Sequence, residues 1–388
     1  MTYDRIVMVQ RADVDRYPPV LHQMRELSEL SGVTVVDRAS DGLSGLDVGI
    51  AKVKRVRISL GKTPNPLRNI AELSALSRAL DRELDAGSSV AIGYDPDAAA
   101  LLLRSAHGGA ALKRIVHLHE LPDLSTAGRI TRRSIRYLIK HLRRADLVVV
   151  PDRERARILA DSYSLSQVPT VVMNCPMTLP KIPDSRLMPL LHERGLDDKR
   201  VVHYQGSVGP DHYLDQIVLS MRTWPTDAIF VIVGGGADQF TAHLRSLAHS
   251  VGVQDRLVLV ERVPYREVMS YAVGATLGVT LLEPTIDNQR FCAGASNKRF
   301  EYAALGIAQI ANADPGMDEI FGSAGLAELL GAVNVETIGD AVVRLLSAQS
   351  FTAAMGERAR HAHLRENNYE AQFAPVLRTI ESWQNIQS

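Results

Sequence analysis

The chain has 388 residues and carries 44 basic and 44 acidic side chains, so its formal net charge of zero gives no bulk attraction to nucleic acid. Its length predicts two or three domains, of which we favour two. With 46% hydrophobic residues and no apolar run approaching a membrane span, the composition is typical of a soluble globular protein. The only two cysteines, Cys175 and Cys292, suit a reducing compartment, and the start of the chain lacks a leader pattern. We therefore expect a cytoplasmic protein.

Short β-branched segments alternate with helical patterns through the first part of the chain. They lie at residues 5–10, 32–38, 53–60, 88–94, 112–120, 146–150 and 170–174. Strands that alternate with helices predict βαβ units and a parallel sheet. We assign residues 1–176 to a first Rossmann-like domain.

A proline-rich stretch then interrupts the alternation. Its four prolines disfavour both a helix and a central strand, so residues 177–198 are predicted to be a linker. A second alternation follows, with strand segments at 200–206, 228–236, 256–263, 275–283 and 308–314. It predicts a second Rossmann-like domain over 199–364, followed by a helical tail of about 365–388 that can pack back onto the first domain.

Two doubly wound parallel-sheet domains give the α/β class. Ligands of open α/β sheets bind outside the carboxyl ends of the strands. The expected site is therefore the cleft between the two domains.

Residues 294–306, GASNKRFEYAALG, pass abruptly from a polar run into an apolar helix. Ser296 is a good N-cap and Gly306 a good stop. The amide end of a helix binds anions, and Lys298 in the first turn adds a full charge. Glu301, one turn later, can accept hydrogen bonds from two hydroxyls, so the pattern fits phosphates beside a diol, as in a nucleotide sugar. On the pattern alone, a solvated pair of Lys298 and Glu301 is the simpler interpretation.

A family resemblance favours the first interpretation. The segment SNKRFEYAALGIAQIANADPG resembles the donor-site segment of retaining glycosyltransferases of family 4, which have the GT-B fold. Further segments resemble the same family in the same order: RRADLVVVPDRERARIL (143–159), VPTVVMNCP (168–176), HYQGS (203–207), VIVGGG (231–236) and LVERVPYREVMSYAVGA (259–275).

The resemblance implies roles for residues of the second domain. Glu301 matches the glutamate that binds the ribose hydroxyls, and Asn297 with Lys298 matches the turn at the donor diphosphate. The other implied donor-site residues are Gly206 and Ser207 at the phosphates, Val263 and Pro264 at the base, Gly234 and Gly235 near the nucleotide, and the cap Ser296.

The chain departs from the family pattern at two positions. Ala293 stands where many members carry a glutamate that touches the transferred sugar. The phosphate-binding arginine that usually follows the first strand of this domain is not evident, and His212 stands nearby. Neutralisation of the diphosphate is then expected to rest on Lys298, with Arg299 or Arg290 as helpers.

In the first domain, HLHELPD (117–123) follows a strand. The resemblance implies that His119 contacts the donor sugar, and Glu120 is the neighbouring carboxylate, so the predicted catalytic set is His119, Glu120 and Lys298. Each of the two first-domain residues is equally well explained as an ordinary loop residue. In the loop RADVDRYPPV, Arg11, Asp13 and Tyr17 are acceptor-side candidates; a solvated loop capped by Asp15 or Pro18 is the simpler reading.

Two further patterns carry competing interpretations. Residues 129–144 form a basic helical segment, with Ile130, Ser134, Leu138 and Leu142 as its expected inner stripe. Such a helix can lie on anionic lipid, although a solvated basic face is the simpler reading. Asp95 and Asp97 form an Asp-x-Asp pair, which we interpret as an N-cap and a first-turn residue of a helix and not as a metal site.

Together these observations predict a retaining glycosyltransferase with the GT-B fold. It would transfer a hexose from a UDP- or GDP-linked sugar to a hydroxyl of a small-molecule, glycan or lipid acceptor by front-side displacement, with no metal and no cofactor besides the nucleotide sugar. Two alternatives stay open: an isomerase similar to the 2-epimerases of UDP-N-acetylglucosamine, and a non-catalytic nucleotide-sugar-binding partner protein.

Overall fold

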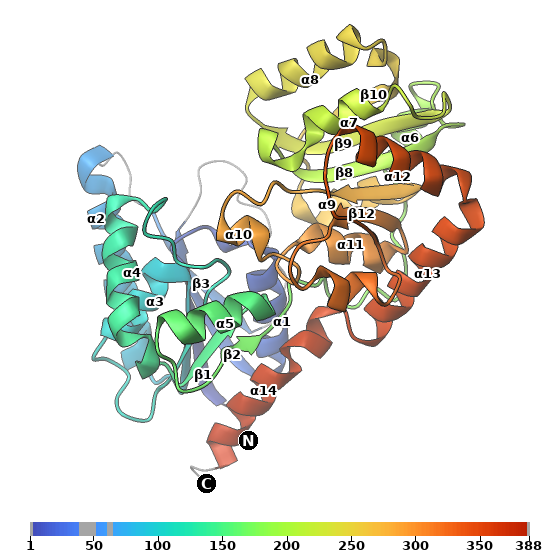
Figure 1. Ribbon diagram of the computed structural model, residues 1–388. Coiled ribbons are helices and arrows are strands. Elements are labelled where there is room, and N and C mark those ends of the chain that lie inside the picture. The colour runs from blue at the N-terminus through green and yellow to red at the C-terminus, as the bar shows by residue number, and fades with distance from the viewer. Residues whose placement is uncertain (1–2, 39–51, 60–64, 386–388) are drawn as a thin grey trace. The chain divides into compact units, whose positions relative to one another are not determined.

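The computed structural model describes residues 3–38, 52–59 and 65–385. The chain divides into two compact units, the first made of Met1–Asn174 with Gln372–Ser388 and the second of Cys175–Ala371. Both units contain one parallel sheet with helices packed on it (Figure 1).

The first unit is built on a seven-stranded parallel sheet in the order β3-β2-β1-β4-β5-β6-β7. All seven predicted strand segments are present. The strands are β1 (Tyr3–Val9), β2 (Ser31–Arg38), β3 (Val53–Ile58), β4 (Val90–Tyr94), β5 (Lys113–His117), β6 (Leu147–Val150) and β7 (Thr170–Val171). The helices between them are α1 (Pro18–Leu30), α2 (Asn65–Asp85), α3 (Asp95–Arg104), α4 (Arg129–His141) and α5 (Arg153–Ser162).

Burial explains why these segments form central strands. In β1, the four residues from Ile6 to Val9 have no exposed surface. A run that is apolar on both faces is typical of a parallel strand covered by helices on both sides. The last helix, α14 (Tyr369–Asn385), belongs to this unit from Gln372 onward, and its Trp383 ring lies 5.7 Å from Nζ of Lys113 on β5.

The second unit is built on a six-stranded parallel sheet in the order β10-β9-β8-β11-β12-β13. Five strands match predicted segments, and the sixth, β13, has only three residues and was not predicted. The strands are β8 (Arg200–Val208), β9 (Ala228–Gly236), β10 (Leu257–Val260), β11 (Leu277–Thr280), β12 (Ala308–Asn312) and β13 (Glu328–Leu330).

Helices cover both faces of this sheet. The helices of this unit are α6 (Leu187–His192), α7 (Leu214–Ser220), α8 (Asp238–Ser250), α9 (Tyr265–Ala272), α10 (Asp287–Arg290), α11 (Asn297–Leu305), α12 (Val335–Ser347) and α13 (Gln349–Arg365). One core cluster joins Tyr204 and Phe230 to α7 and α12, while another joins Leu187 and Leu191 of α6 to Val231.

Helix α6 corrects the prediction that residues 177–198 contain no helix. Pro189 is the third residue of α6. The amides of the first helical turn have no partner within the helix, so a proline there breaks no hydrogen bond.

The carboxyl ends of β8 and β9 approach unusually closely. Gly206 pairs with Gly234, and a Cβ atom on Gly234 would lie 1.8 Å from the carbonyl oxygen of Gly206. Gly206 has a φ of +126°, which side chains rarely permit. Only glycine fits either position.

We predict that Gly234→Ala destabilises the protein strongly. The new methyl group meets a backbone oxygen, which cannot move aside as a side chain can, so we expect a loss of about 3 kcal/mol in the free energy of unfolding. Gly331→Ala is the control, because nothing lies within 4 Å of a Cβ there. Urea unfolding of both variants tests the prediction, and equal midpoints for the two would contradict it.

Candidate functional site

Helix α11 begins at the predicted position but is not capped as predicted. Ser296 occupies the N-cap position with φ −89° and ψ 105°, yet its side chain makes no capping hydrogen bond. The expected role of the Ser296 hydroxyl is therefore wrong. Oδ1 of Asn297, the next residue, is buried and has no partner among the described residues. The first amides of α11 therefore have no side-chain cap from Ser296.

Lys298 lies across the end of β8. Its Nζ donates to Oη of Tyr204 at 3.1 Å and lies 4.8 Å from the centre of that ring. A Cβ atom on Gly206 would lie 2.5 Å from Cε of Lys298, so the glycine makes room for the lysine. The structure therefore brings together Lys298, Gly206 and, through the strand pair, Gly234.

Glu301 is buried one turn along α11, with 3% of its surface exposed. Its Oε2 accepts from Nε2 of Gln205 at 2.5 Å, and Tyr265 also hydrogen-bonds to the carboxylate. Burial raises the pKa of Glu301, opposed by these two hydrogen bonds and by the charge of Lys298. The simpler interpretation of Lys298 and Glu301 as a solvated surface pair is wrong, because the carboxylate is buried and each side chain has other partners.

The pKa values of Lys298 and His212 indicate which of the two is charged at pH 7 in the free protein. Burial, with the nearby charge of Arg299, lowers the pKa of Lys298 to about 8, so it remains mostly cationic at pH 7. Burial and the Lys298 charge lower the pKa of His212 to about 4. His212 lies 5.6 Å from the Tyr204 ring and is neutral at pH 7, so it offers a hydrogen bond and not a charge.

Both predicted helper arginines make contacts with other residues of the second unit. Arg299 is buried, donates to the carbonyl oxygen of Cys292 at 2.9 Å and pairs with Asp314 at 3.9 Å. Arg290 is exposed and lies 5.5 Å from the ring of Phe291. Of the three basic residues that were predicted to neutralise the diphosphate, Lys298 is the one that lies across the end of β8.

The other predicted donor-site residues lie on neighbouring segments of the second unit. Ser207 is exposed and pairs with Gly235 in the sheet, and its carbonyl oxygen accepts from Oη of Tyr204 at 2.5 Å. Val263 packs against the core, and Pro264 is the N-cap of α9. Helix α9 then begins with Tyr265, the residue that contacts Glu301.

In the first unit, His119 and Glu120 follow the end of β5 after one intervening residue. His119 is buried with 8% exposure, whereas Glu120 is exposed. The ring centre of Tyr17 lies 6.0 Å from that of His119, so one acceptor-side candidate joins the predicted catalytic histidine. Asp95 also joins it: its Oδ1 accepts from the backbone N–H of His119 at 2.9 Å. Asp95 is thus not the predicted N-cap; it is the first residue of α3, and Tyr94 holds the cap position.

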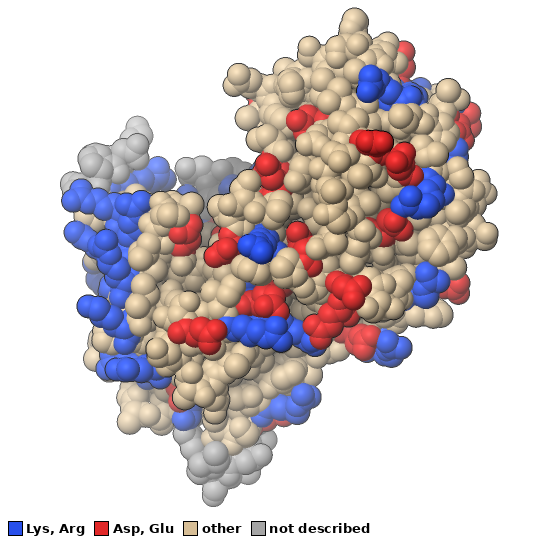
Figure 2. All heavy atoms as spheres, in the orientation of Figure 1, with Lys and Arg blue, Asp and Glu red and all other residues tan. Residues whose placement is uncertain are grey.

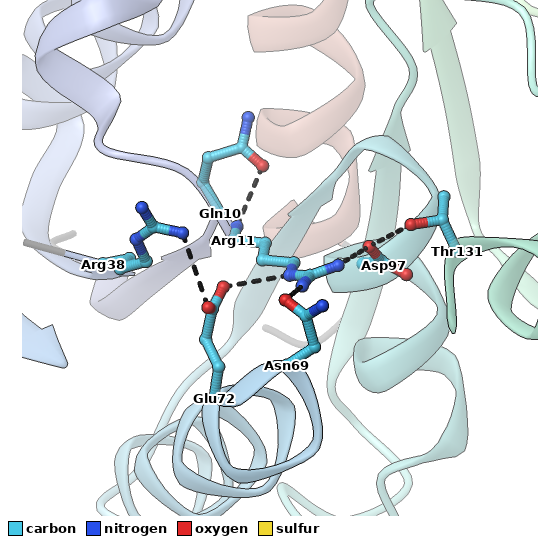
Figure 3. A network of polar contacts seen from close by, with 7 residues as sticks. All are labelled: Gln10, Arg11, Arg38, Asn69, Glu72, Asp97 and Thr131. Carbon is cyan, nitrogen blue, oxygen red and sulfur yellow. Dashed lines mark hydrogen bonds and ion pairs between the residues drawn. The ribbon is translucent and has the colours of Figure 1, made fainter. Parts of the chain in front are cut away.

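Arg11 and Asp13 turn toward other residues of the first unit. Figure 3 shows the Arg11 guanidinium donating to Glu72 at 2.9 Å, Asp97 at 2.6 Å and Asn69 at 2.8 Å. Asp97 also accepts from Thr131, so it is a node of this network and a first-turn residue as predicted.

Asp13 forms the N-cap of the short helix η1 (Val14–Arg16) and lies 3.6 Å from Arg55. The loop is thus capped by Asp13 and not by Asp15, while Pro18 is the first residue of α1.

The sequence did not predict the contacts of four residues with the candidate site residues. Tyr204 contacts Lys298, Gln205 and Tyr265 contact Glu301, and Asp95 contacts His119. Tyr204 and Gln205 directly precede Gly206, and a tyrosine and a glutamine within a buried strand were a usable signal. Tyr265 and Asp95 gave no such signal, because each looks like an ordinary residue at the start of a helix.

Two properties of the described residues bear on metal binding and on membranes. No group of three or more His, Cys, Asp or Glu side chains there is placed to hold a metal ion. Within the same residues, every helix is too short or too polar to traverse a lipid bilayer.

The second unit of the chain is similar to a known protein family. Residues 192–362 match the family of glycosyl transferases group 1. The match spans the second unit's sheet together with the Gly206, Lys298 and Glu301 site. No curated protein matches the chain.

Solved structures match the whole chain at low identity. HepE of Anabaena, in complex with UDP-glucose, is 12% identical with a TM-score of 0.75, covering 97% of this chain and 99% of that one. Sucrose-phosphate synthase of Thermosynechococcus elongatus is 14% identical with a TM-score of 0.75, covering 99% and 100%. WaaG, a glycosyltransferase involved in lipopolysaccharide biosynthesis, is 14% identical with a TM-score of 0.65, covering 95% and 98%. These likenesses and the two parallel sheets confirm the GT-B fold.

We predict that Lys298→Met makes the protein more stable while it removes the charge of Lys298 from the site. The folded-state pKa of about 8 lies below the ordinary 10.5, so between these values the unfolded chain holds a proton that the folded chain has lost. Wild-type stability therefore rises with pH from about 8 to 10.5, and below pH 8 the buried charge lowers it. We expect the variant to gain about 1–2 kcal/mol at pH 7, less than the full shift implies because the side chain is only half-buried.

Urea unfolding at pH 7, 8, 9 and 10 measures this difference. The exposed Lys181, changed to Met, is the matched control and should follow the wild-type pH profile. A lower stability of Lys298→Met at pH 7, or a pH slope equal to that of wild type, would contradict the prediction.

Proposed function

We propose that the protein is a retaining glycosyltransferase that transfers a hexose from a UDP- or GDP-linked sugar to a hydroxyl group of an acceptor. The observation that carries the proposal is the arrangement of Lys298 and Glu301 beside Gly206. A partly buried ammonium group fits a diphosphate, and a buried carboxylate one helical turn away fits the two hydroxyls of a ribose. The match to glycosyl transferases group 1 and the nucleotide sugar bound to HepE support the same donor.

The proposed reaction is a front-side displacement that needs no metal. The bond between the anomeric carbon and the diphosphate oxygen breaks, and a bond from that carbon to the acceptor oxygen forms on the same face. The acceptor's proton passes to the departing phosphate oxygen, so the products are a glycoside of unchanged configuration and a nucleoside diphosphate. Lys298 and the first amides of α11 stabilise the charge that develops on the leaving group.

His119 would orient the sugar or the acceptor from the first unit, with Tyr17 beside it. Glu120 is an exposed neighbour, and Arg11 and Asp13 would act only by shaping this region, since each is bound to residues of its own unit. Ala293 in place of a glutamate fits a site that recognises the transferred sugar through other groups.

The two alternatives make different predictions for a mixture of the protein and a nucleotide sugar. A 2-epimerase would change the sugar without an acceptor. A non-catalytic binder would leave the nucleotide sugar intact. Release of the nucleoside diphosphate, by transfer or by hydrolysis, favours the glycosyltransferase.

We predict that UDP or GDP, but not both equally, raises the melting temperature of the protein, and that Glu301→Gln largely removes the effect. A ligand that binds only the folded state stabilises it by about 2.7 kcal/mol at a hundred times its Kd. Loss of the carboxylate removes a charged partner of the ribose hydroxyls, so we expect affinity to fall at least tenfold. A thermal-shift titration with nucleoside mono- and diphosphates measures both effects.

Asp255→Asn is the control for this change, because it alters an exposed carboxylate of the same unit in the same way. It should respond to nucleotide as wild type does. If Glu301→Gln were stabilised as much as Asp255→Asn, the ribose role of Glu301 would be excluded.

We also propose that the first unit contacts anionic lipid through its basic helix. Along α4 and the following turn, seven basic side chains are exposed: Arg129, Arg132, Arg133, Arg136, Lys140, Arg143 and Arg144. Figure 2 shows basic side chains gathered along the side of the molecule where Figure 1 places α4. The buried stripe is close to the predicted one, except that Ile135 lies in it and Ile130 is only half-buried. Ile139, among the basic residues, is 41% exposed.

We predict that the protein sediments with vesicles containing anionic lipid and not with neutral vesicles. Each basic residue near such a surface contributes about 1 kcal/mol, so changing Arg129, Arg133, Arg136 and Lys140 to Gln should weaken binding at least tenfold. The control replaces four exposed arginines of the second unit, Arg194, Arg222, Arg245 and Arg266, by Gln. Equal binding by both variants would favour a basic face that is simply solvated.

A further inference from the structure

His119 is held within a stack of rings in the first unit. Its ring centre lies 4.5 Å from that of His117 and 5.6 Å from that of Tyr94, with interplanar angles of 27° and 11°. Arg155 of α5 donates to its carbonyl oxygen at 2.5 Å. Both the backbone and the ring of His119 are therefore fixed, which a histidine in an ordinary surface loop would not be.

Asp95 reaches His119 from the start of α3. Its Oδ1 accepts from the backbone N–H of His119 at 2.9 Å, and its Oδ2 lies 3.2 Å from Nδ1 of the imidazole. Gln10 donates to the same Oδ2 at 3.1 Å. Asp95 adopts a φ of +54°, in the left-handed region that aspartate and asparagine enter more readily than most residues other than glycine. From this backbone position the aspartate binds His119 at two points, where an aspartate at a helix start would ordinarily cap the helix.

This contact determines which ring nitrogen carries the proton. Oδ1 and Oδ2 of Asp95 accept from the His119 backbone and from Gln10, and these hydrogen bonds favour the ionised carboxylate whether the imidazole is neutral or charged. The net pKa of Asp95 lies below its usual value although burial raises it. An ionised carboxylate can only accept hydrogen bonds, so Nδ1 of His119 must be the donor. In a neutral imidazole, Nε2 then has a free lone pair. Nε2 is buried and no described residue bonds to it.

We propose that Asp95 is a positioning residue that holds His119 as the Nδ1–H tautomer, so that Nε2 serves as a hydrogen-bond acceptor for a hydroxyl group. The hydroxyl belongs either to the transferred sugar or to the acceptor. The role in catalysis rests on the proposed glycosyltransferase function, whereas the tautomer is a property of the free protein.

Asp95→Asn is the sharpest variant. It keeps the size of the side chain, and asparagine tolerates the left-handed backbone conformation better than most residues. Its amide group can donate to Nδ1, which moves the imidazole proton to Nε2 and turns an acceptor into a donor. Nitrogen-15 NMR of the histidine ring reads this change directly, without any ligand.

We expect His119 to be the Nδ1–H tautomer in wild type and the Nε2–H tautomer in Asp95→Asn. Turnover of the nucleotide sugar should fall at least tenfold, with an unchanged thermal shift by the nucleoside diphosphate, because nucleotide binding lies in the second unit. Asp97→Asn is the control for the tautomer: it removes a carboxylate two residues away that binds Arg11 and Thr131, and it should leave the His119 spectrum as in wild type.

Hydrolysis of the donor without acceptor separates the two sources of the hydroxyl. If hydrolysis falls together with transfer, the hydroxyl is that of the donor sugar; if transfer alone falls, it is that of the acceptor. The proposal is overturned if wild-type His119 carries its proton on Nε2, a result that needs no variant to fold. It is also overturned if Asp95→Asn shifts the tautomer and leaves turnover unchanged. A protein that shows the tautomer shift but binds no nucleotide would instead count against the proposed function.

Discussion

The second unit depends on the close approach of three segments at the carboxyl ends of β8 and β9. The backbone at Gly234 lies against the carbonyl oxygen of Gly206, and the Lys298 side chain lies against the other side of Gly206. No residue with a Cβ can stand at either glycine without displacing a backbone oxygen or the lysine. The position of the Lys298 ammonium is therefore set by the sheet itself, and the start of α11 is aligned with the strand ends as a consequence.

This arrangement puts the charged groups of Lys298 and Glu301 in buried or partly buried positions. Burial lowers the pKa of Lys298 and raises the pKa of Glu301, so each charged form is less favourable than in water. The neighbours supply hydrogen bonds, from Tyr265 and Gln205 to the carboxylate and from the ammonium to Tyr204. A bound diphosphate would relieve the cost of burying Lys298. Perturbed groups of this kind, gathered at the strand ends of an α/β sheet, are the expected mark of a binding site.

The sequence predicted the fold well because the signals for it are local. Buried runs such as that in β1 are apolar throughout, and twelve predicted strand segments are present. The two misses also have local causes: β13 is three residues long, and Pro189 stands in the first turn of α6, where a proline is harmless. Lys298 and Glu301 were predicted because they share one short segment. Their partners were not, because Tyr204 and Gln205 are separated from them by 94 and 96 residues, and only the folded sheet brings them together.

The two wrong predictions of a helix cap, at Ser296 and at Asp95, have a feature in common. Ser296 and Asp95 both satisfy the sequence rule for an N-cap, and neither side chain caps its helix. At Ser296 the first amides of the helix have no side-chain cap. At Asp95 the carboxylate contacts His119 instead, and the backbone of Asp95 has a left-handed conformation with a φ of +54°. Sequence rules for helix capping are expected to fail at sites where a residue serves function and not the stability of the fold. A buried polar atom that no described residue bonds to lies beside each of these helix starts, Oδ1 of Asn297 in one unit and Nε2 of His119 in the other. In each unit, a helix start without the expected side-chain cap therefore lies next to a residue that we propose to contact the substrate, Lys298 in one unit and His119 in the other.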